Sequence, residues 1–149
     1  MDKTKFVALV IAVLLLLVLP YGASGEVTTP YIEIEYPRDG QTVGERTELV
    51  VVAEGYDLRN PFVSIEGEHG IAVGFPLEGC IYSAPGVTDL EGTDLTTIPQ
   101  PPGPMKMYCK TEINLGSFQG ERIRLSVSVL ENNEILMDSV GLFVSGQCV

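Results

Sequence analysis

Hydrophobic and polar residues alternate most regularly near the C-terminal end of the chain, between Glu121 and Val144. A period of two is typical of a β-strand with one buried face. The first series of apolar positions is Ile123, Leu125, Val127 and Val129, and the second is Leu136, Val140, Leu142 and Val144, with Asp138 interrupting it. The two series predict a long antiparallel β-hairpin with its turn at Asn132-Asn133.

Four earlier stretches also predict strands. They are Tyr31–Tyr36, Thr47–Glu54, Pro61–Glu66 and Ile71–Phe75. Glu33 and Glu35 alternate with isoleucines in the first stretch, and such outward charges suit an exposed or edge strand. The second stretch is apolar on both faces at its centre, which favours a position in the middle of a sheet. Between these two, Pro37-Arg38-Asp39-Gly40 predicts a tight turn.

Regularity is lost between Leu77 and Pro104, a segment with five prolines and four glycines. Structureless segments of this length are usually functional or mobile in compact domains. Alternation returns in Met105–Leu115. No helical period appears after residue 25, and about seven strands joined by Gly, Pro, Asp and Asn turns predict an all-β fold. We expect a single antiparallel β-sandwich over residues 26–149, with residues 77–104 as an irregular excursion.

The N-terminal segment has a different character. Lys3 and Lys5 precede an apolar run over Phe6–Leu19, and Pro20 and small residues up to Gly25 follow it. This order matches a secretory signal peptide and favours cleavage after Gly25. The apolar run would form about 21 Å of helix, less than the ~30 Å of a membrane core. Including the next residues lengthens it, so a retained N-terminal membrane anchor stays open. In either case we expect residues 26–149 to be exported, as a secreted or cell-surface domain.

Acidic residues dominate the part that would be exported. Without residues 1–25 the chain has 7 basic and 19 acidic residues, a formal net charge of −12. Such a surface repels nucleic acid and anionic lipid headgroups. Nucleic acid is therefore excluded as a partner, and membrane contact is expected only through the N-terminal segment.

All three cysteines, Cys80, Cys109 and Cys148, lie in this part. In an oxidising compartment two of them should pair and one is left over. Three pairings are open, and we favour Cys80 with Cys109 because both border the irregular excursion. A bridge that closes a loop of ~30 residues stabilises by roughly 3.5 kcal/mol on the chain-entropy model. Cys148 would then be free or would pair with another chain.

One resemblance to a known family follows from the first strand and turn. The run I-E-I-E-Y-P-R-D-G-Q-T-V-G, followed by an apolar strand and closed by a C-terminal hairpin, resembles the immunoglobulin-like domains of prokaryotic cell-surface proteins. The likeness covers residues 31–76 and 105–145, and its turn motif is Pro37, Asp39, Gly40 and Val43. The chain departs from antibody domains because it has no tryptophan and its cysteines lie elsewhere. The resemblance implies adhesion, spacing or binding roles, with no shared catalytic residue.

Two groups of residues have ligand chemistry. Asp89, Glu91 and Asp94 offer clustered oxygen ligands that suit Ca²⁺, although their spacing lacks the EF-hand pattern and a solvated acidic loop is the alternative. His69 lies in a turn with Glu66 and Glu68. One imidazole and two flexible carboxylates make a poor zinc site, and an exposed turn histidine is the favoured interpretation. No G-x-S-x-G elbow marks a catalytic serine.

The aromatic residues Tyr82 and Tyr108 are expected to pack over the outer face of a sheet. The alternative is that they form, together with the proline run, an aromatic or extended edge for a partner. The sequence therefore predicts a non-enzymatic binding or structural module with a protein or cell-envelope partner and no cofactor. The alternatives are a subunit of a larger surface assembly, joined through an exposed edge strand or Cys148, and a metal-dependent enzyme that uses the acidic loop.

Overall fold

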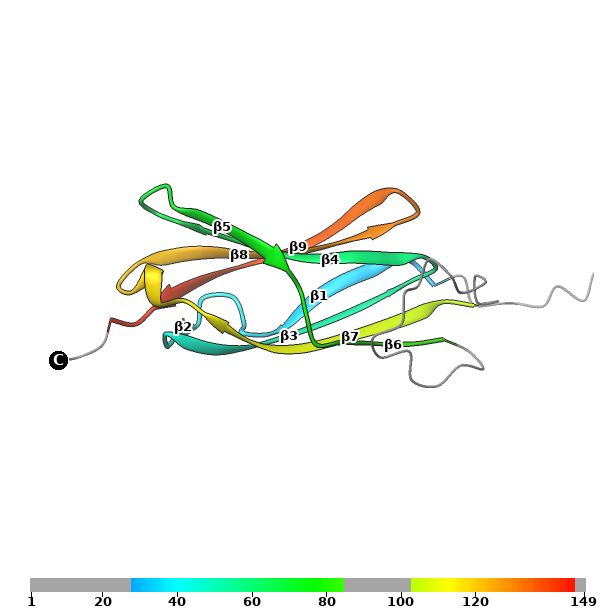
Figure 1. Cartoon of the computed structure of the whole chain (residues 1–149), viewed down its shortest axis with the longest axis horizontal. Helices are drawn as coiled ribbons and strands as arrows, with labels where there is room; N and C mark the ends of the chain where they lie inside the picture. The colour runs from blue at the N-terminus through cyan, green and yellow to red at the C-terminus, as the bar shows by residue number, and fades with distance from the viewer. Residues whose placement is uncertain (1–27, 85–102, 147–149) are drawn as a thin grey trace, which may run out of the picture.

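The structure, a computed structural model, describes residues 28–84 and 103–146. These residues form two β-sheets that lie face to face (Figure 1). The strands are β1 (Tyr31–Tyr36), β2 (Thr42–Val43), β3 (Arg46–Gly55), β4 (Leu58–Gly67), β5 (Ala72–Pro76), β6 (Cys80–Ser83), β7 (Met105–Asn114), β8 (Arg122–Glu131) and β9 (Glu134–Val144). One turn of 3-10 helix, η2 (Gly116–Phe118), precedes β8. The all-β prediction is confirmed for the described residues.

The strand order agrees with the edge strand and the central strand that the sequence pattern predicted. The four-stranded sheet has the order β1-β3-β7-β6, and the five-stranded sheet has the order β2-β9-β8-β4-β5. All neighbours are antiparallel except β2 and β9, which run parallel. The glutamate-bearing β1 is an edge strand, and the apolar β3 lies between β1 and β7. Both positions agree with the prediction.

The core lies between the two sheets and draws on nearly every strand. The inner row of β8 consists of Ile123, Leu125, Val127 and Val129, all at most 4% exposed. Leu49 and Val51 of β3 and Met107 and Cys109 of β7 face this row from the other sheet and are equally buried. Side chains from two inner faces that interdigitate in this way are the main source of stability in a β-sandwich.

The β8–β9 hairpin is continuous in register from Arg122↔Phe143 to Glu131↔Glu134. Asn132 and Asn133 form its two-residue turn with φ values of 49° and 66°. Positive φ at both central positions is the geometry that matches the twist of the flanking strands, and asparagine tolerates it well. The hairpin end rises away from the four-stranded sheet (Figure 1). The predicted hairpin and its turn are therefore confirmed.

Several short elements differ from the sequence prediction. The structure places β6 within the segment expected to be irregular, and β2 where no strand was expected. Both are too short for a period of two to be visible in the sequence. β4 begins at Leu58, three residues earlier than predicted, because a bulge at Asn60, with φ of 50°, lets the strand continue through its proline. Residues 85–102 lie outside the described part of the chain.

The predicted tight turn after β1 carries the chain from one sheet to the other. The amide of Gln41 donates to the carbonyl of Arg38 at 3.1 Å, and Gly40 has a φ of 77°. Pro37, preceded by a cis peptide bond, ends the pairing of β1 with β3. β2 then pairs with β9 in the other sheet. Asp39 and Gly40 thus lie in a connection between the two sheets and not in a hairpin within one sheet.

The expected signal or anchor segment lies outside the described residues. Within residues 28–84 and 103–146, no helix has the length and apolar character needed to cross a membrane.

Candidate binding surfaces

The seam between β1 and β9 is closed by side-chain carboxylates. Asp138 Oδ2 accepts a hydrogen bond from the amide of Ile34 at 2.8 Å, and its Oδ1 accepts from the amide of Ser139 at 2.9 Å. Asp39 Oδ1 accepts from the amide of Gly141 at 2.7 Å, while the amide of Gly40 donates to the carbonyl of Gly141 at 2.7 Å. These acids therefore replace strand partners where β1 leaves one sheet and the chain joins the other.

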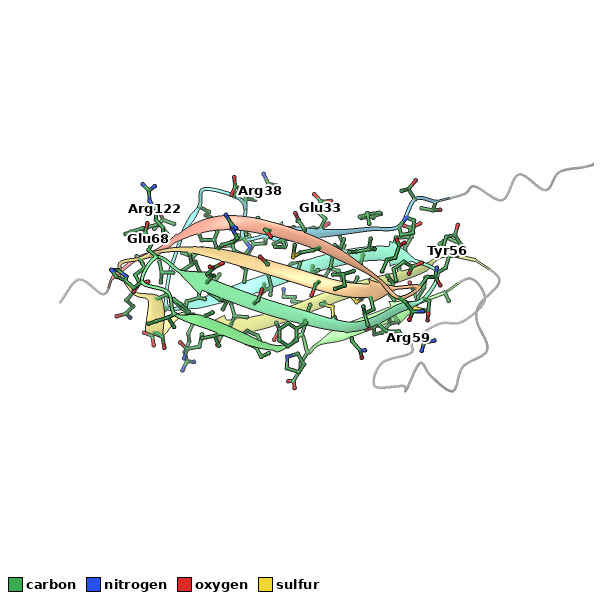
Figure 2. The ribbon with its side chains drawn as sticks, turned by 90° about the horizontal axis from the view of Figure 1, so that it is seen from above. Glu33, Arg38, Tyr56, Arg59, Glu68 and Arg122 are labelled. Carbon is green, nitrogen blue, oxygen red and sulfur yellow. A yellow bond between two sulfur atoms is a disulfide. The ribbon has the colours of Figure 1, made fainter. Side chains whose placement is uncertain are left out.

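A shallow groove of about 850 Å³ runs along this seam. Its charged lining consists of Glu33, Glu35, Arg38, Asp39, Glu48, Lys110 and Asp138. Glu33 and Arg38 are visible along this side of the molecule in Figure 2. The groove has five acidic side chains against two basic ones, and one of the basic ones, Lys110, lies 3.1 Å from Glu48. It is an acidic surface.

Glu131 is a buried carboxylate that the sequence prediction did not single out. It is 4% exposed and lies at the end of β8. Its two oxygens accept from the amides of Tyr56 and Asp57, each at 2.9 Å, and Asn132 donates to Oε1 at 3.0 Å. A Cβ at Gly55 would lie 2.5 Å from Oε2, so this glycine makes room for the carboxylate. Glu131 thus holds the β3–β4 turn against the hairpin, which is an architectural role.

His69 pairs with a residue other than the two neighbours considered from the sequence. Its Nδ1 lies 3.0 Å from Oε1 of Glu121, and the His69 side chain is 72% exposed. The second oxygen of Glu121 is buried and has no hydrogen-bond partner within the described part of the chain. Among the described residues no three histidine, cysteine or acidic side chains come together in a way that could hold a metal ion. Asp89, Glu91 and Asp94 lie outside the described residues, so the calcium hypothesis stays a prediction.

The structure contains a disulfide between Cys80 and Cys109, the pairing favoured from the sequence. The two residues lie directly opposite each other on β6 and β7, with their Cα atoms 4.0 Å apart. The bridge therefore joins neighbouring strands of one sheet, whereas the antibody bridge joins the two sheets. It fastens the four-residue β6 to the rest of the fold. Cys148 lies outside the described residues.

The two tyrosines of this region lie on opposite faces of the four-stranded sheet. Tyr108 is 43% exposed on the outer face. Tyr82 is opposite Met107 in the register and packs against the core, so its predicted place on the outer face is wrong. Burial raises the pKa of the Tyr82 hydroxyl above its usual value because the charged phenolate would lose hydration.

The outer face of the five-stranded sheet has a polar centre and an apolar corner. Ser126 and Ser139 lie opposite each other, and their hydroxyl oxygens are 2.8 Å apart. Closer to the hairpin turn, Ile135 and Met137 project from the same face of β9 and are 69% and 65% exposed. Figure 2 looks down onto this sheet, with Tyr56 and Arg59 at one end and Glu68 and Arg122 at the other.

Comparison with known proteins gives the fold alone. No family model and no curated protein matches the chain. Among solved structures, an endo-β-1,4-mannanase from Thermotoga petrophila is similar, with a TM-score of 0.53 and 13% identity over 83% of this chain and 22% of that one. An engineered protein is similar with a TM-score of 0.50 and 14% identity, over 78% of this chain and 20% of that one. The chain thus spans about a fifth of the length of each.

Proposed function

We propose that the chain is a non-catalytic immunoglobulin-like module of an exported protein, and that it acts by holding a protein partner at the five-stranded sheet. The observation that carries this proposal is the exposure of Ile135 and Met137, side by side on one face of β9. Apolar side chains that stand together at a surface mark interaction sites more often than scattered ones do. This corner is the part of the described surface best suited to a partner.

Strand order supports the immunoglobulin-like part of the proposal. In immunoglobulin domains the first, second, fifth and fourth strands form one sheet, and the third, sixth and seventh strands form the other. The order β1-β3-β7-β6 opposite β9-β8-β4 follows this arrangement, with β2 as a continuation of the first strand and β5 as an added edge. The departure is the disulfide, which lies within one sheet.

Export is supported by two independent features. The apolar N-terminal segment with its small-residue end is typical of a signal peptide. The Cys80–Cys109 bridge is of a kind that persists in oxidising compartments and is rare where thiols are kept reduced. Both features favour an extracellular or cell-envelope location.

The non-catalytic part is supported by the hydrogen bonds of three acids. Asp39, Asp138 and Glu131 each accept hydrogen bonds from backbone amides. These carboxylates stabilise turns and the seam between the sheets, which leaves them poorly suited to proton transfer.

A second candidate is a subunit of a larger surface assembly. Part of β9 has no strand beside it within the described residues, so an edge is open to another chain. Cys148 offers a separate, covalent route. A non-reducing gel separates the covalent route from a monomer, because only a Cys148-linked pair doubles in apparent mass and returns to a monomer with reductant.

Cell fractionation tests the proposal. The full chain, made in its source cell with its own N-terminal segment, should be recovered from the envelope or the medium, and a matched chain lacking residues 1–25 should stay inside the cell. Recovery of both chains inside the cell would contradict the proposal. In the same preparation, release of reducing sugar from β-1,4-mannan would contradict the non-catalytic assignment.

A further inference from the structure

The backbone amides of β9 that face away from β8 are hydrogen-bonded toward the C-terminal end of the strand. Toward its N-terminal end they have no partner among the described residues. Three of the outward amides have partners: Phe143 with the carbonyl of Gln41 at 3.0 Å, Gly141 with Asp39 Oδ1 at 2.7 Å, and Ser139 with Asp138 Oδ1 at 2.9 Å. The unbroken register with β8 points every second residue the same way, so Met137 and Ile135 continue this row. Their amides have no hydrogen-bond partner among residues 28–84 and 103–146.

The side chains of the same two residues are exposed. Ile135 and Met137 have the largest exposed fractions of the large apolar side chains in the described part of the chain. Lying two residues apart on one strand, they project from the same face of the sheet. An added strand would therefore gain main-chain hydrogen bonds and two apolar contacts at alternate positions.

The other edges of the sheets are less open. β1 has Glu33 and Glu35 on its surface, and the outward amide of Ile34 is already bound by Asp138. In β5, Pro76 occupies an outward position and has no amide hydrogen to donate. β6 has only four residues. These features discourage strand pairing, and the stretch Ile135–Met137 of β9 has none of them.

The acidic groove indicates the charge of the occupant. The groove is bordered by Asp138 and Ser139, where the open edge of β9 begins, and by Glu33 and Glu35 across the seam. Since side chains of an added strand alternate between faces, one set would contact Ile135 and Met137 and the other set would lie toward the groove. Basic side chains in the second set would complement its acidic lining.

Resting on the proposed function, we propose that the edge of β9 between Glu134 and Ser139 binds an extended segment of a partner protein in which apolar residues alternate with lysine or arginine. A second copy of this chain fits less well. Each copy has a formal net charge of −11, or −12 without the N-terminal segment, and pairing the same edges would bring Glu134 toward Asp138 of the other copy. Like charges of this size oppose association.

Titration with a synthetic peptide tests the proposal. The exported form of the full chain, with Cys148→Ser to prevent covalent pairing, is titrated with a fluorescent peptide of about seven residues in which valine alternates with lysine. We expect saturable binding that weakens with added salt, because exposed charge pairs are screened. Amide exchange at Ile135 and Met137 should slow when the peptide is bound.

Two peptide controls separate strand addition from nonspecific charge attraction. A proline in place of the central valine removes one main-chain donor, and it should weaken binding about tenfold or more. Glutamate in place of lysine should abolish binding. Equal binding of all three peptides would overturn the proposal.

Matched variants locate the site on the protein. Met137→Lys places a charge on the open edge at an exposed position, whereas Ile81→Lys changes an exposed apolar residue of the other sheet that does not line the groove. Circular dichroism and the retained disulfide check that both variants fold. We expect about a tenfold loss or more for Met137→Lys and no change for Ile81→Lys. The reverse order, or an equal loss in both, would overturn the proposal.

The same experiments distinguish this proposal from the one on which it rests. If the chain is exported and oxidised but does not bind the lysine–valine peptide, the proposed binding of a cationic strand is contradicted and the proposed function is not. If the chain dimerises without peptide and Met137→Lys prevents this dimerisation, the edge of β9 binds a second copy of the chain. That result also contradicts the proposed binding of a cationic strand. A chain that stays reduced inside the cell contradicts the proposed function whatever it binds.

Discussion

Asp138 Oδ2 accepts a hydrogen bond from the backbone amide of Ile34 at 2.8 Å, across 104 residues of sequence. The contact joins β9 of the five-stranded sheet to β1 of the four-stranded sheet. An edge strand needs a partner for its outward amides, and here a side chain supplies it. The same carboxylate also holds the amide of Ser139 at 2.9 Å, so it is satisfied at both oxygens. Asp138 is therefore a structural residue at the seam of the sandwich.

Substitution of Asp138 should lower the free energy of unfolding. Asp138→Ala leaves two amides without their acceptor, and hydrogen bonds to charged groups contribute about 1.5–3 kcal/mol each. Asp138→Asn keeps one acceptor oxygen and should lose about half as much. Glu134→Ala, an exposed acid on the same strand, is the control and should change stability by less than ~0.5 kcal/mol. Urea denaturation measures all three, and equal stability of Asp138→Ala and the control would show that the seam contact is not needed.

Gly55 and Glu131 should behave as a coupled pair. Glu131→Ala removes the acceptor for the amides of Tyr56 and Asp57, with an expected loss of about 2–3 kcal/mol. Gly55→Ala should also destabilise because its Cβ would lie 2.5 Å from Glu131 Oε2. In the double variant that clash is gone, so the two losses should sum to more than the measured value. Strict additivity in a double-mutant cycle would mean that the two residues act independently.

Stability should fall in alkaline solution because of Tyr82. Burial raises the pKa of its hydroxyl above the usual value of 10.0, so the folded state holds this proton more tightly than the unfolded state. The contribution is present below about pH 10 and is lost as the pH rises through the raised pKa. Tyr82→Phe should flatten the decline, and Tyr108→Phe, on the exposed outer face, should leave it unchanged. A titration of phenolate absorbance should show the latest step disappear only in Tyr82→Phe. Its persistence there would assign the step to another tyrosine.

Removal of the disulfide should destabilise the sandwich without changing its strands. The bridge spans 29 residues of sequence, and the chain-entropy model gives roughly 3.5 kcal/mol for a loop of this size. Cys80→Ser combined with Cys109→Ser should show this loss in thermal and chemical denaturation, with far-ultraviolet circular dichroism preserved. Cys148→Ser is the matched control and should retain full stability. The opposite ranking would mean that Cys148 takes part in the stabilising bridge.

The long strands could be predicted from the sequence because their signal is local. In β8 and β9 each strand displays its own alternation, and Asn132-Asn133 marks the turn between them. A strand of four residues such as β6 shows too few alternations to stand out from a proline-rich surrounding. Its place is set by pairing with β7, which is a property of the folded chain.

The acids that hold the fold could not be assigned from the sequence. From the sequence, Glu131 would be assigned as an ordinary turn residue. In the structure it is buried, because the amide of Tyr56, 75 residues away, donates a hydrogen bond to it. Asp138 interrupts an apolar series, but its partner Ile34 lies in the first strand. The open edge of β9 could not be predicted from the sequence either, because the neighbours of a strand depend on sheet topology. Exposure of Ile135 and Met137 follows only once the inner face of β9 is known.

The intact mass of the exported protein, alkylated without prior reduction, shows whether the chain is an exported module closed by a disulfide. An exported module closed by the Cys80–Cys109 bridge should carry a single alkyl group, on Cys148, and cleavage after Gly25 should give a chain that starts at Glu26. Peptide mapping should then find residues 80 and 109 in one linked pair. A chain that carries three alkyl groups would contain no disulfide, and this result would contradict an exported module closed by the Cys80–Cys109 bridge.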